Sequence, residues 1–321
     1  MKKKTIIISL VIIMLIATVL FGCTKKDSKV DSEGVEKKIS VVTTIFPIYD
    51  FVRQIAGDHV DLTMMLPPGA ESHSYEPTPQ DIIKLHQSKL FIYVGGDSDA
   101  WVDGILDSTN KDKMNILTLM DCVDVVEEEL VDGMQEEEEE EEGGEAELDE
   151  HVWTSPKNAV LIVAKITEEL CEIDPDNSES YKKNAQSYTK ELNTLDQSFK
   201  EVVDNSARKE IILGDRFPFR YFVDTYGLKY YAAFPGCSTD TEPSASTVSF
   251  LIDKVKEDKI PVIFHIELSN EQMCDSIANA TGAKKELLNA VHNVSKKDFE
   301  AGVTYIDLME HNVKVLKEAL N

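Results

Sequence analysis

A periodic segment near the middle of the chain limits how the rest can be arranged. Seven apolar residues recur there at alternating intervals of four and three: Tyr181, Ala185, Tyr188, Leu192, Leu195, Phe199 and Val202. This spacing places one apolar stripe along one face of an α-helix. The helix would have about 25 residues and span nearly 40 Å at about 1.5 Å per residue. Its length and central place favour a rigid connector between two lobes, residues 179–206, over an ordinary packing helix within one domain.

Strands and helices alternate on both sides of this segment. The strands predicted from β-branched and apolar runs are 39–46, 60–66, 90–94, 115–120, 210–214, 230–235 and 262–268. Three helices are predicted to begin at Pro47, Thr78-Pro79 and Ser155-Pro156. Three more are predicted over 219–226, 246–256 and 303–320. Another is predicted from a Ser269–Gln272 capping box and ends near Gly282. This order is typical of the α/β class with mostly parallel sheets. We therefore expect two similar α/β lobes, residues 39–178 and 207–321.

The N-terminal residues 1–22 have the features of a signal peptide. Three lysines precede an apolar run, Ile6 to Phe21, and the sequence L-F-G-C ends at Cys23. The run is short for a membrane-spanning helix, although an uncleaved membrane anchor is the alternative interpretation. L-F-G-C resembles a bacterial lipobox, so we expect cleavage before Cys23 and a lipid on its thiol. Residues 23–38 are polar and predict a flexible tether. With either a cleaved signal peptide or an uncleaved anchor, the rest of the chain is expected outside the cytoplasmic membrane.

The charge of the chain is strongly negative and unevenly distributed. Lys and Arg number 33 against 59 Asp and Glu, a formal net charge of −26. A general nucleic-acid binder is excluded, because phosphate binding needs a basic surface. Residues 121–150 hold 17 acidic residues and no Lys or Arg, including seven consecutive Glu at 136–142. Such a run is typical of a solvated loop, and its field can also raise the local concentration of cations.

Four cysteines follow Cys23, namely Cys122, Cys171, Cys237 and Cys274. They form no C-x-x-C pair, so a thiolate zinc knuckle is not predicted. Outside the cell some of them could pair, and four cysteines allow three complete pairings. The sequence does not choose among these pairings.

His73 has the most informative surroundings of the seven histidines. It lies in H-S-Y-E-P-T-P-Q-D, after a predicted strand and before a capped helix, where open α/β sheets bind ligands. With the lipobox-like sequence, the long helix, T-G-A-K around Gly282 and Y-I-D-L-M-E-H-N near the C-terminus, this motif resembles a known family over residues 36–321. That family is the metal-binding receptors of bacterial zinc and manganese ABC transporters, the cluster A-I substrate-binding proteins.

The resemblance implies a metal site between the two lobes, built from His, Asp and Glu. His151, in L-D-E-H-V-W-T-S-P, stands where the family has its second His, although Glu150 replaces the family's Pro. Glu267 ends a predicted strand and aligns with the family's C-terminal acid. His265 lies two residues earlier on the same side of that strand and is a reserve ligand.

This sequence departs from the family's pattern at the third ligand position. Arg216 falls where many members have a His, and an arginine cannot ligate a metal. Asp215, one residue earlier, could ligate, or it could pair with Arg216 or cap the next helix. Manganese-type members have an Asp in the loop before the terminal helix, and counting back from the end of Y-I-D-L-M-E-H-N puts Asn293 there, beside His292. The implied metal ligands are therefore His73, His151, His292 and Glu267, with Asp215 and His265 in reserve.

We expect a monomeric, lipid-anchored extracytoplasmic receptor that binds Zn²⁺ and delivers it to an ABC permease without catalysing a reaction. A histidine-rich site favours Zn²⁺, whereas Mn²⁺ prefers more oxygen ligands, so a manganese or iron receptor is the nearest alternative. A zinc hydrolase would need an open coordination position, and neither H-E-x-x-H nor H-x-E with C-x-x-C occurs. A surface adhesin is a third alternative. For His59, His86 and His311 we expect surface or structural roles.

Overall fold

The computed structural model describes residues 38–72, 75–106, 113–135, 147–238 and 243–321, all within the unit Lys38–Asn321. The predicted signal peptide, Cys23, His73 and the Glu run at 136–142 lie outside the described residues. No helix in the described part of the chain is long and apolar enough to cross a membrane.

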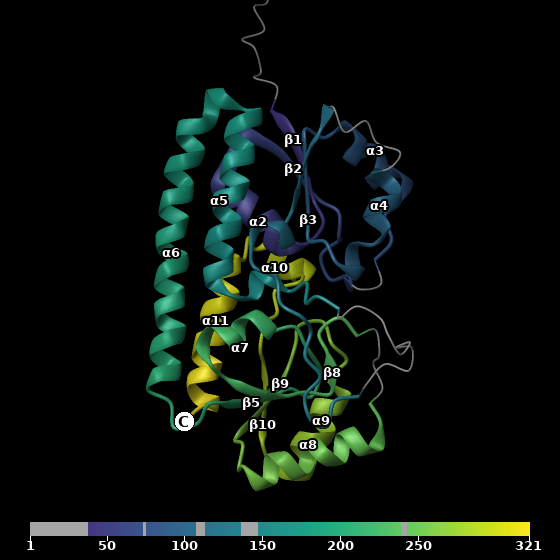
Figure 1. The fold of residues 1–321 in the computed structure, drawn as a ribbon, viewed down its shortest axis with the longest axis vertical. Helices are drawn as coiled ribbons and strands as arrows, with labels where there is room; N and C mark the ends of the chain where they lie inside the picture. Colours follow the sequence, from purple (N-terminus) through teal and green to yellow (C-terminus); the bar gives the residue numbers. More distant parts are fainter. Residues whose placement is uncertain (1–37, 73–74, 107–112, 136–146, 239–242) are drawn as a thin grey trace, which may run out of the picture. The chain divides into compact units, whose positions relative to one another are not determined.

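The N-terminal lobe is built on a four-stranded parallel sheet with the order β2-β1-β3-β4 (Figure 1). Its elements are β1 (Ile39–Thr43), α2 (Phe46–Ala56), β2 (Val60–Met64), α3 (Pro79–Gln87), β3 (Leu90–Tyr93), α4 (Trp101–Leu106), β4 (Asn115–Thr118) and α5 (Pro156–Ile173). Neighbouring side chains of a strand face opposite sides of the sheet. Val41 accordingly packs in one core with α2 and α5, and Val42 packs in another with α3 and α4. Helices therefore cover both faces of this sheet.

The C-terminal lobe contains three parallel strand pairs, β5 with β7, β6 with β8, and β9 with β10. Its elements are β5 (Glu210–Ile212), β6 (Arg216–Phe217), α7 (Arg220–Tyr226), β7 (Lys229–Tyr231), β8 (Phe234–Pro235), α8 (Ala245–Glu257), β9 (Val262–His265), α9 (Gln272–Thr281), β10 (Lys284–Leu287), α10 (Lys296–Glu300) and α11 (Tyr305–Ala319). A bridge between Leu213 and Phe264 joins the β5–β7 pair to the β9–β10 pair. The parallel strand pairings of both lobes confirm the α/β class.

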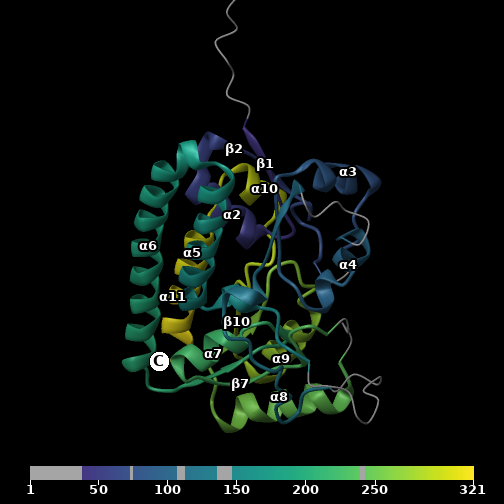
Figure 2. The same ribbon diagram turned by 45° about the horizontal axis from the view of Figure 1, so that its top comes forward.

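Helix α6 (Ser178–Asp204) is the periodic helix of the sequence, with 27 residues. Six of the seven predicted apolar residues are buried, and Val203 is buried in place of the half-buried Val202. The helix lies beside α5 and α11 in both views (Figures 1 and 2) and also contacts α2. It therefore packs against helices of both lobes.

Several element ends differ from those predicted. The strand predicted over 39–46 ends at Thr43, because α2 already begins at Phe46. The predicted Ser269–Gln272 capping box is wrong. The N-cap of α9 is Glu271, whose backbone is left-handed. The Gln272 N–H donates to the side-chain oxygen of Asn270 (3.0 Å). Strand β10 is absent from the predicted elements because its sequence, Lys-Lys-Glu-Leu, is polar. The four cysteines after Cys23 are all free thiols, so no pairing is formed.

Candidate metal centre

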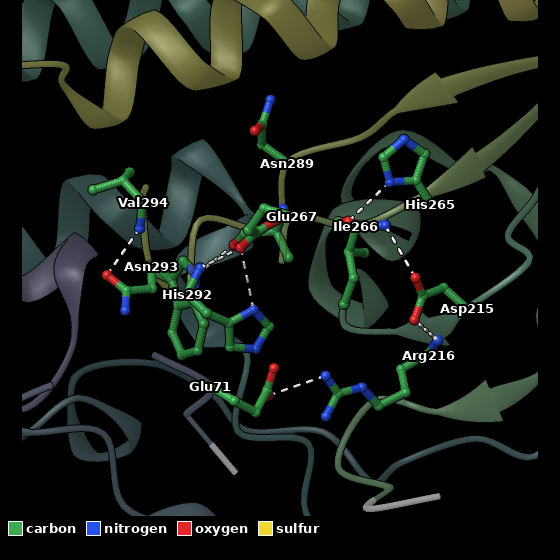
Figure 3. A network of polar contacts seen from close by, with 12 residues as sticks. Glu71, Asp215, Arg216, His265, Ile266, Glu267, Asn289, His292, Asn293 and Val294 are labelled. Carbon is green, nitrogen blue, oxygen red and sulfur yellow. Dashed lines mark hydrogen bonds and ion pairs between the residues drawn. The ribbon is translucent and has the colours of Figure 1, made fainter. Parts of the chain in front are cut away.

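His292 lies in the loop that follows β10, and a strained turn presents it. The residue before it, Val291, is buried and β-branched and has a φ of +64°, a conformation that costs about 1–3 kcal/mol. The Glu267 carboxylate accepts N–H bonds from the residues on both sides of Val291, Ala290 (2.7 Å) and His292 (2.8 Å). Glu267 therefore holds the strained turn and fixes the direction of His292 (Figure 3).

The same carboxylate lies against one edge of the His292 ring. Glu267 Oε1 is 3.5 Å from His292 Nδ1, and the ring lies between Glu267 and Glu71 in Figure 3. A carboxylate that faces Nδ1 favours the proton on that nitrogen and leaves the lone pair on Nε2 for a metal. Burial lowers the pKa of His292 well below its usual value, and the charges of His151 and Arg216 lower it further. The ring is therefore neutral, which is the metal-binding form.

His151 has a similar carboxylate neighbour in the N-terminal lobe. Asp149 Oδ1 accepts the backbone N–H of His151 (2.8 Å) and lies 3.2 Å from its Nδ1. Burial alone would lower the pKa of His151, but the charges of Asp149, Glu150 and Glu128 raise it above the usual value. A proton therefore competes with a metal for this ring more strongly than it would for a free imidazole. Gly236 packs against the ring so closely that a Cβ there would lie 2.9 Å from Cε1.

The structure brings His151 and His292 together. Their ring centroids are 4.8 Å apart with the planes at 80°, and Trp153 contacts both rings, at 5.5 and 5.2 Å. Trp153 Nε1 also donates to the Ala290 carbonyl (2.8 Å), which ties the segment after His151 to the loop of His292. Two adjacent imidazoles, each with a carboxylate at Nδ1, are typical of the donor set of a zinc site.

His73 lies outside the described residues, but the loop that leads towards it is held by the loop of His292. The side-chain amide of Asn293 donates to the carbonyls of Pro67 (2.8 Å) and Ala70 (2.9 Å). Its oxygen accepts the N–H of Val294 (2.8 Å). Asn293 therefore joins the two lobes through these bonds.

Arg216 forms an ion pair between the two lobes. Its Nη2 is 3.0 Å from Glu71 Oε1, and its Nη1 donates to the Ser238 carbonyl (3.3 Å). The carboxylate of Asp215 accepts the backbone N–H of Arg216 (2.9 Å) and of Ile266 (3.3 Å). Asp215 thus joins two backbone segments of the C-terminal lobe, and its hydrogen bonds in the described part of the chain do not reach the imidazole pair.

His265 is not brought to the imidazole pair. Its Nδ1 lies 3.0 Å from the carbonyl of Ile266, and Figure 3 shows its ring well apart from that of His292. His59 packs edge-on against an aromatic ring of α6, and His311 Nε2 lies 3.3 Å from a carbonyl of β10. These two contacts are structural, as expected from the sequence.

A pocket opens beside His292 on the side of the N-terminal lobe. Besides His292, its polar and aromatic lining consists of Thr44, Ser72, Tyr75, Ser98, Asp99, Trp101, Glu150 and Trp153. Burial raises the pKa of Asp99 to about 7. Burial also raises the pKa of Glu150, whose Oε2 accepts the N–H of Ser98 (3.1 Å). These raised pKa values favour the neutral form of both acids, so they place less negative charge beside the imidazole than two solvated carboxylates would.

Sequence analysis did not identify Glu71 or Asp149. Each stands two residues before a candidate histidine, in E-S-H and D-E-H, and this shared spacing is the signal that points to them. The close packing of Gly236 on His151 has no local sequence signal, because it depends on how the two lobes meet.

Comparisons with known proteins support a metal-binding receptor. The family described as "Zinc-uptake complex component A periplasmic" matches residues 41–319. The chain is 34% identical to the high-affinity zinc uptake system protein ZnuA of Bacillus subtilis over 93% of each chain. It is 32% identical to the zinc-binding lipoprotein AdcA of Streptococcus pneumoniae over 99% of this chain but only 61% of AdcA. The solved Zn(II)-bound ZnuA-like domain of that AdcA is similar with a TM-score of 0.72 and 31% identity, covering 88% of this chain and 99% of the domain.

Proposed function

Because the chain belongs to the zinc-uptake complex component A family, we propose that it is an extracytoplasmic receptor that binds Zn²⁺ as cargo and delivers it to an ABC permease for import. The pair of buried imidazoles at 4.8 Å is the observation that carries this proposal. Nitrogen ligands suit Zn²⁺ better than Mn²⁺. Manganese remains the alternative cargo, and the competition experiment below decides between the two.

We propose that His73, His151 and His292 ligate the zinc ion. Direct ligation by Glu267 stays a prediction from the sequence. Its contacts support a different role, because both oxygens accept backbone N–H groups on the Nδ1 side of His292. Glu267 would then act on the ion through His292, as carboxylates behind metal-bound histidines do. Ligation by Asp215 or His265 also stays a prediction from the sequence, which no contact in the described part of the chain supports.

We further propose that the receptor is monomeric and is anchored to the outer face of the cell membrane by a lipid on Cys23. The two lobes, residues 39–178 and 207–321, would hold the ion between them, with residues 179–206 as their connector. Mass spectrometry of the membrane-extracted protein tests the lipid, because a mature chain that begins at an acylated Cys23 has a distinct mass.

Competitive metal loading tests the proposed function. The detergent-solubilised full-length chain is stripped with a chelator, offered equal zinc and manganese, and assayed by elemental analysis. We expect one tightly bound zinc ion. Alanine at His151 or His292 should lower zinc affinity at least about tenfold, or about 1.4 kcal/mol, and alanine at Asp215 should lower it less. His59→Ala, a control histidine that packs against Tyr181 of α6, should not change it. Preferential loading with manganese, or zinc affinity unchanged in both histidine variants, would contradict the proposal.

A further inference from the structure

The segment that carries His151 is held by a tyrosine of the C-terminal lobe. The hydroxyl of Tyr221, on α7, donates to the backbone carbonyl of Asp149 (2.6 Å) and accepts the N–H of Val126 (3.3 Å). The Asp149 N–H in turn donates to the Val126 carbonyl (2.9 Å). Tyr221 is 4% exposed, so water does not compete for its two hydrogen bonds.

The Tyr221 hydroxyl stands in the place of a backbone hydrogen bond. Two residues that form a hydrogen-bonded antiparallel pair exchange two N–H···O bonds. Val126 and Asp149 flank an antiparallel bridge, Glu127 with Leu148, and make one of these bonds directly. The hydroxyl completes the pair because it is both a donor and an acceptor, and it bonds the remaining N–H and the remaining carbonyl. It therefore fixes the backbone of Asp149 from the other lobe.

This restraint reaches His151 through the side chain of Asp149. One carboxylate oxygen of Asp149 accepts the backbone N–H of His151 (2.8 Å) and lies 3.2 Å from its Nδ1. The carbonyl that Tyr221 holds and the carboxylate that faces the ring belong to the same residue. A displacement of the tyrosine would therefore displace the carboxylate, and with it the support of the ring.

Two further contacts tie the residues after His151 to the C-terminal lobe. Ser155 Oγ lies 2.9 Å from the hydroxyl oxygen of Thr225, which is also on α7. The Trp153 carbonyl accepts the hydroxyl of Tyr305 (2.8 Å), the first residue of α11. The segment is thus held from the C-terminal lobe on both sides of His151, and α7 provides a contact on each side.

We propose that α7 is the positioning element for His151, and that it acts chiefly through the Tyr221 hydroxyl and the Asp149 carboxylate. The inference rests on the proposed function and deepens it, because zinc capture by a histidine of the N-terminal lobe then depends on a helix of the C-terminal lobe. Tyr221 acts through Asp149, so its effect on zinc affinity requires the carboxylate. A residue that only stabilises the fold would have the same effect with or without that carboxylate.

A double-mutant cycle on zinc affinity tests this role in the detergent-solubilised full-length chain, by competition with a chromogenic chelator. Tyr221→Phe removes only the hydroxyl and should lower the affinity about tenfold, and Asp149→Ala should lower it about 10–100-fold. In the Asp149→Ala background, Tyr221→Phe should cost no more than about twofold. Tyr230→Phe is the matched control, because this buried hydroxyl of the same lobe donates to Glu129 instead. Its affinity should stay within about twofold of the wild type.

Two results would overturn the positioning role: a zinc affinity of Tyr221→Phe within about twofold of the wild type, or an equal tenfold loss in both backgrounds. If circular dichroism shows that Tyr221→Phe does not fold, Thr225→Val replaces it, because it removes the other contact of α7 with little change of shape. It should lower zinc affinity at least about threefold, and an unchanged affinity would overturn the role of α7. Unchanged zinc affinity in His151→Ala would instead contradict the proposed function, so the two failures are distinguishable.

Discussion

Replacing Glu267 by Gln tests whether a buried carboxylate sets the direction of a metal-binding histidine. The carboxylate spans the left-handed turn at Val291 by accepting N–H bonds from Ala290 and His292. Glutamine has nearly the same shape, so the substitution changes chemistry more than packing. It keeps one acceptor oxygen, but it turns an NH₂ group towards the second N–H, where two donors then face each other.

The structure sets the size of the expected effect. A hydrogen bond to a charged group contributes about 1.5–3 kcal/mol, and one of the two is lost. The turn at Val291, which costs about 1–3 kcal/mol, is then held by a single bond. We expect the metal-free variant to lose about 2–3 kcal/mol of unfolding free energy. Removing the group behind a metal-bound His costs about 10–100-fold in metal affinity, so zinc affinity should fall by about 1.4–2.7 kcal/mol.

Two measurements separate these effects. Urea unfolding of the metal-free protein gives the stability, and competition with a chromogenic chelator gives the zinc affinity. Glu318→Gln is the matched control, because Glu318 is an exposed carboxylate that pairs with Lys284 on the surface. Zinc affinity within about threefold of the wild type would refute the positioning role. A loss far beyond about 100-fold would indicate that Glu267 is itself a ligand.

Three further predictions follow from the electrostatics. Zinc affinity should fall at least about tenfold per pH unit below the raised pKa of His151, because a proton competes with the metal there while the lowered pKa of His292 adds no further proton. Competition titrations between about pH 5 and pH 8 that show no slope would contradict this. Burial raises the pKa of Asp99 from 3.8 to about 7, so the folded state binds the extra proton and loses stability as the pH rises through that window. Asp99→Asn should remove about 2–3 kcal/mol of this loss between about pH 5 and pH 7.5, as measured by urea unfolding at both pH values. Deleting residues 135–144 should leave one tight zinc site and remove only weak, salt-sensitive binding, because charges outside a site are screened over about 8–10 Å; calorimetry that shows loss of the tight site would contradict this.

The spacing of apolar residues and the capping motifs predicted those helices whose formation depends on residues close together in the sequence. The 4-3 spacing of apolar residues predicted α6 and its buried face, because a helix must bury one stripe. Thr78 caps α3 through its side chain, with Asp81 as the reciprocal partner. The Ser269 prediction failed because Glu271 adopts a left-handed backbone, which the pattern of residue types does not show.

The candidate site was predictable only in its ligand types. The motif around His151 and the position of His292 near the C-terminus pointed to two imidazoles, which lie adjacent in the structure. Asp149, which faces His151, stands only two residues before it, whereas Glu267, which orients His292, comes from a distant part of the chain. Glu267 acts across 23 and 25 residues on a turn that is strained at Val291. No periodicity or spacing in the sequence encodes such a contact.

Arg216, at a position where a histidine was expected from the sequence, lies near the loop that presents His292. Arginine cannot ligate a metal, and its charge near the site would repel a divalent ion unless it were compensated. Glu71 provides this compensation at 3.0 Å, and the side chains are 13% and 39% exposed for Arg216 and Glu71. An ion pair this accessible contributes no more than about 1 kcal/mol to stability. Its main role is therefore to hold two segments of the chain in position. It links the loop before His73 to β6 across the lobes. After burial and the charge of His151, the same arginine charge also lowers the pKa of His292 and so favours its neutral form.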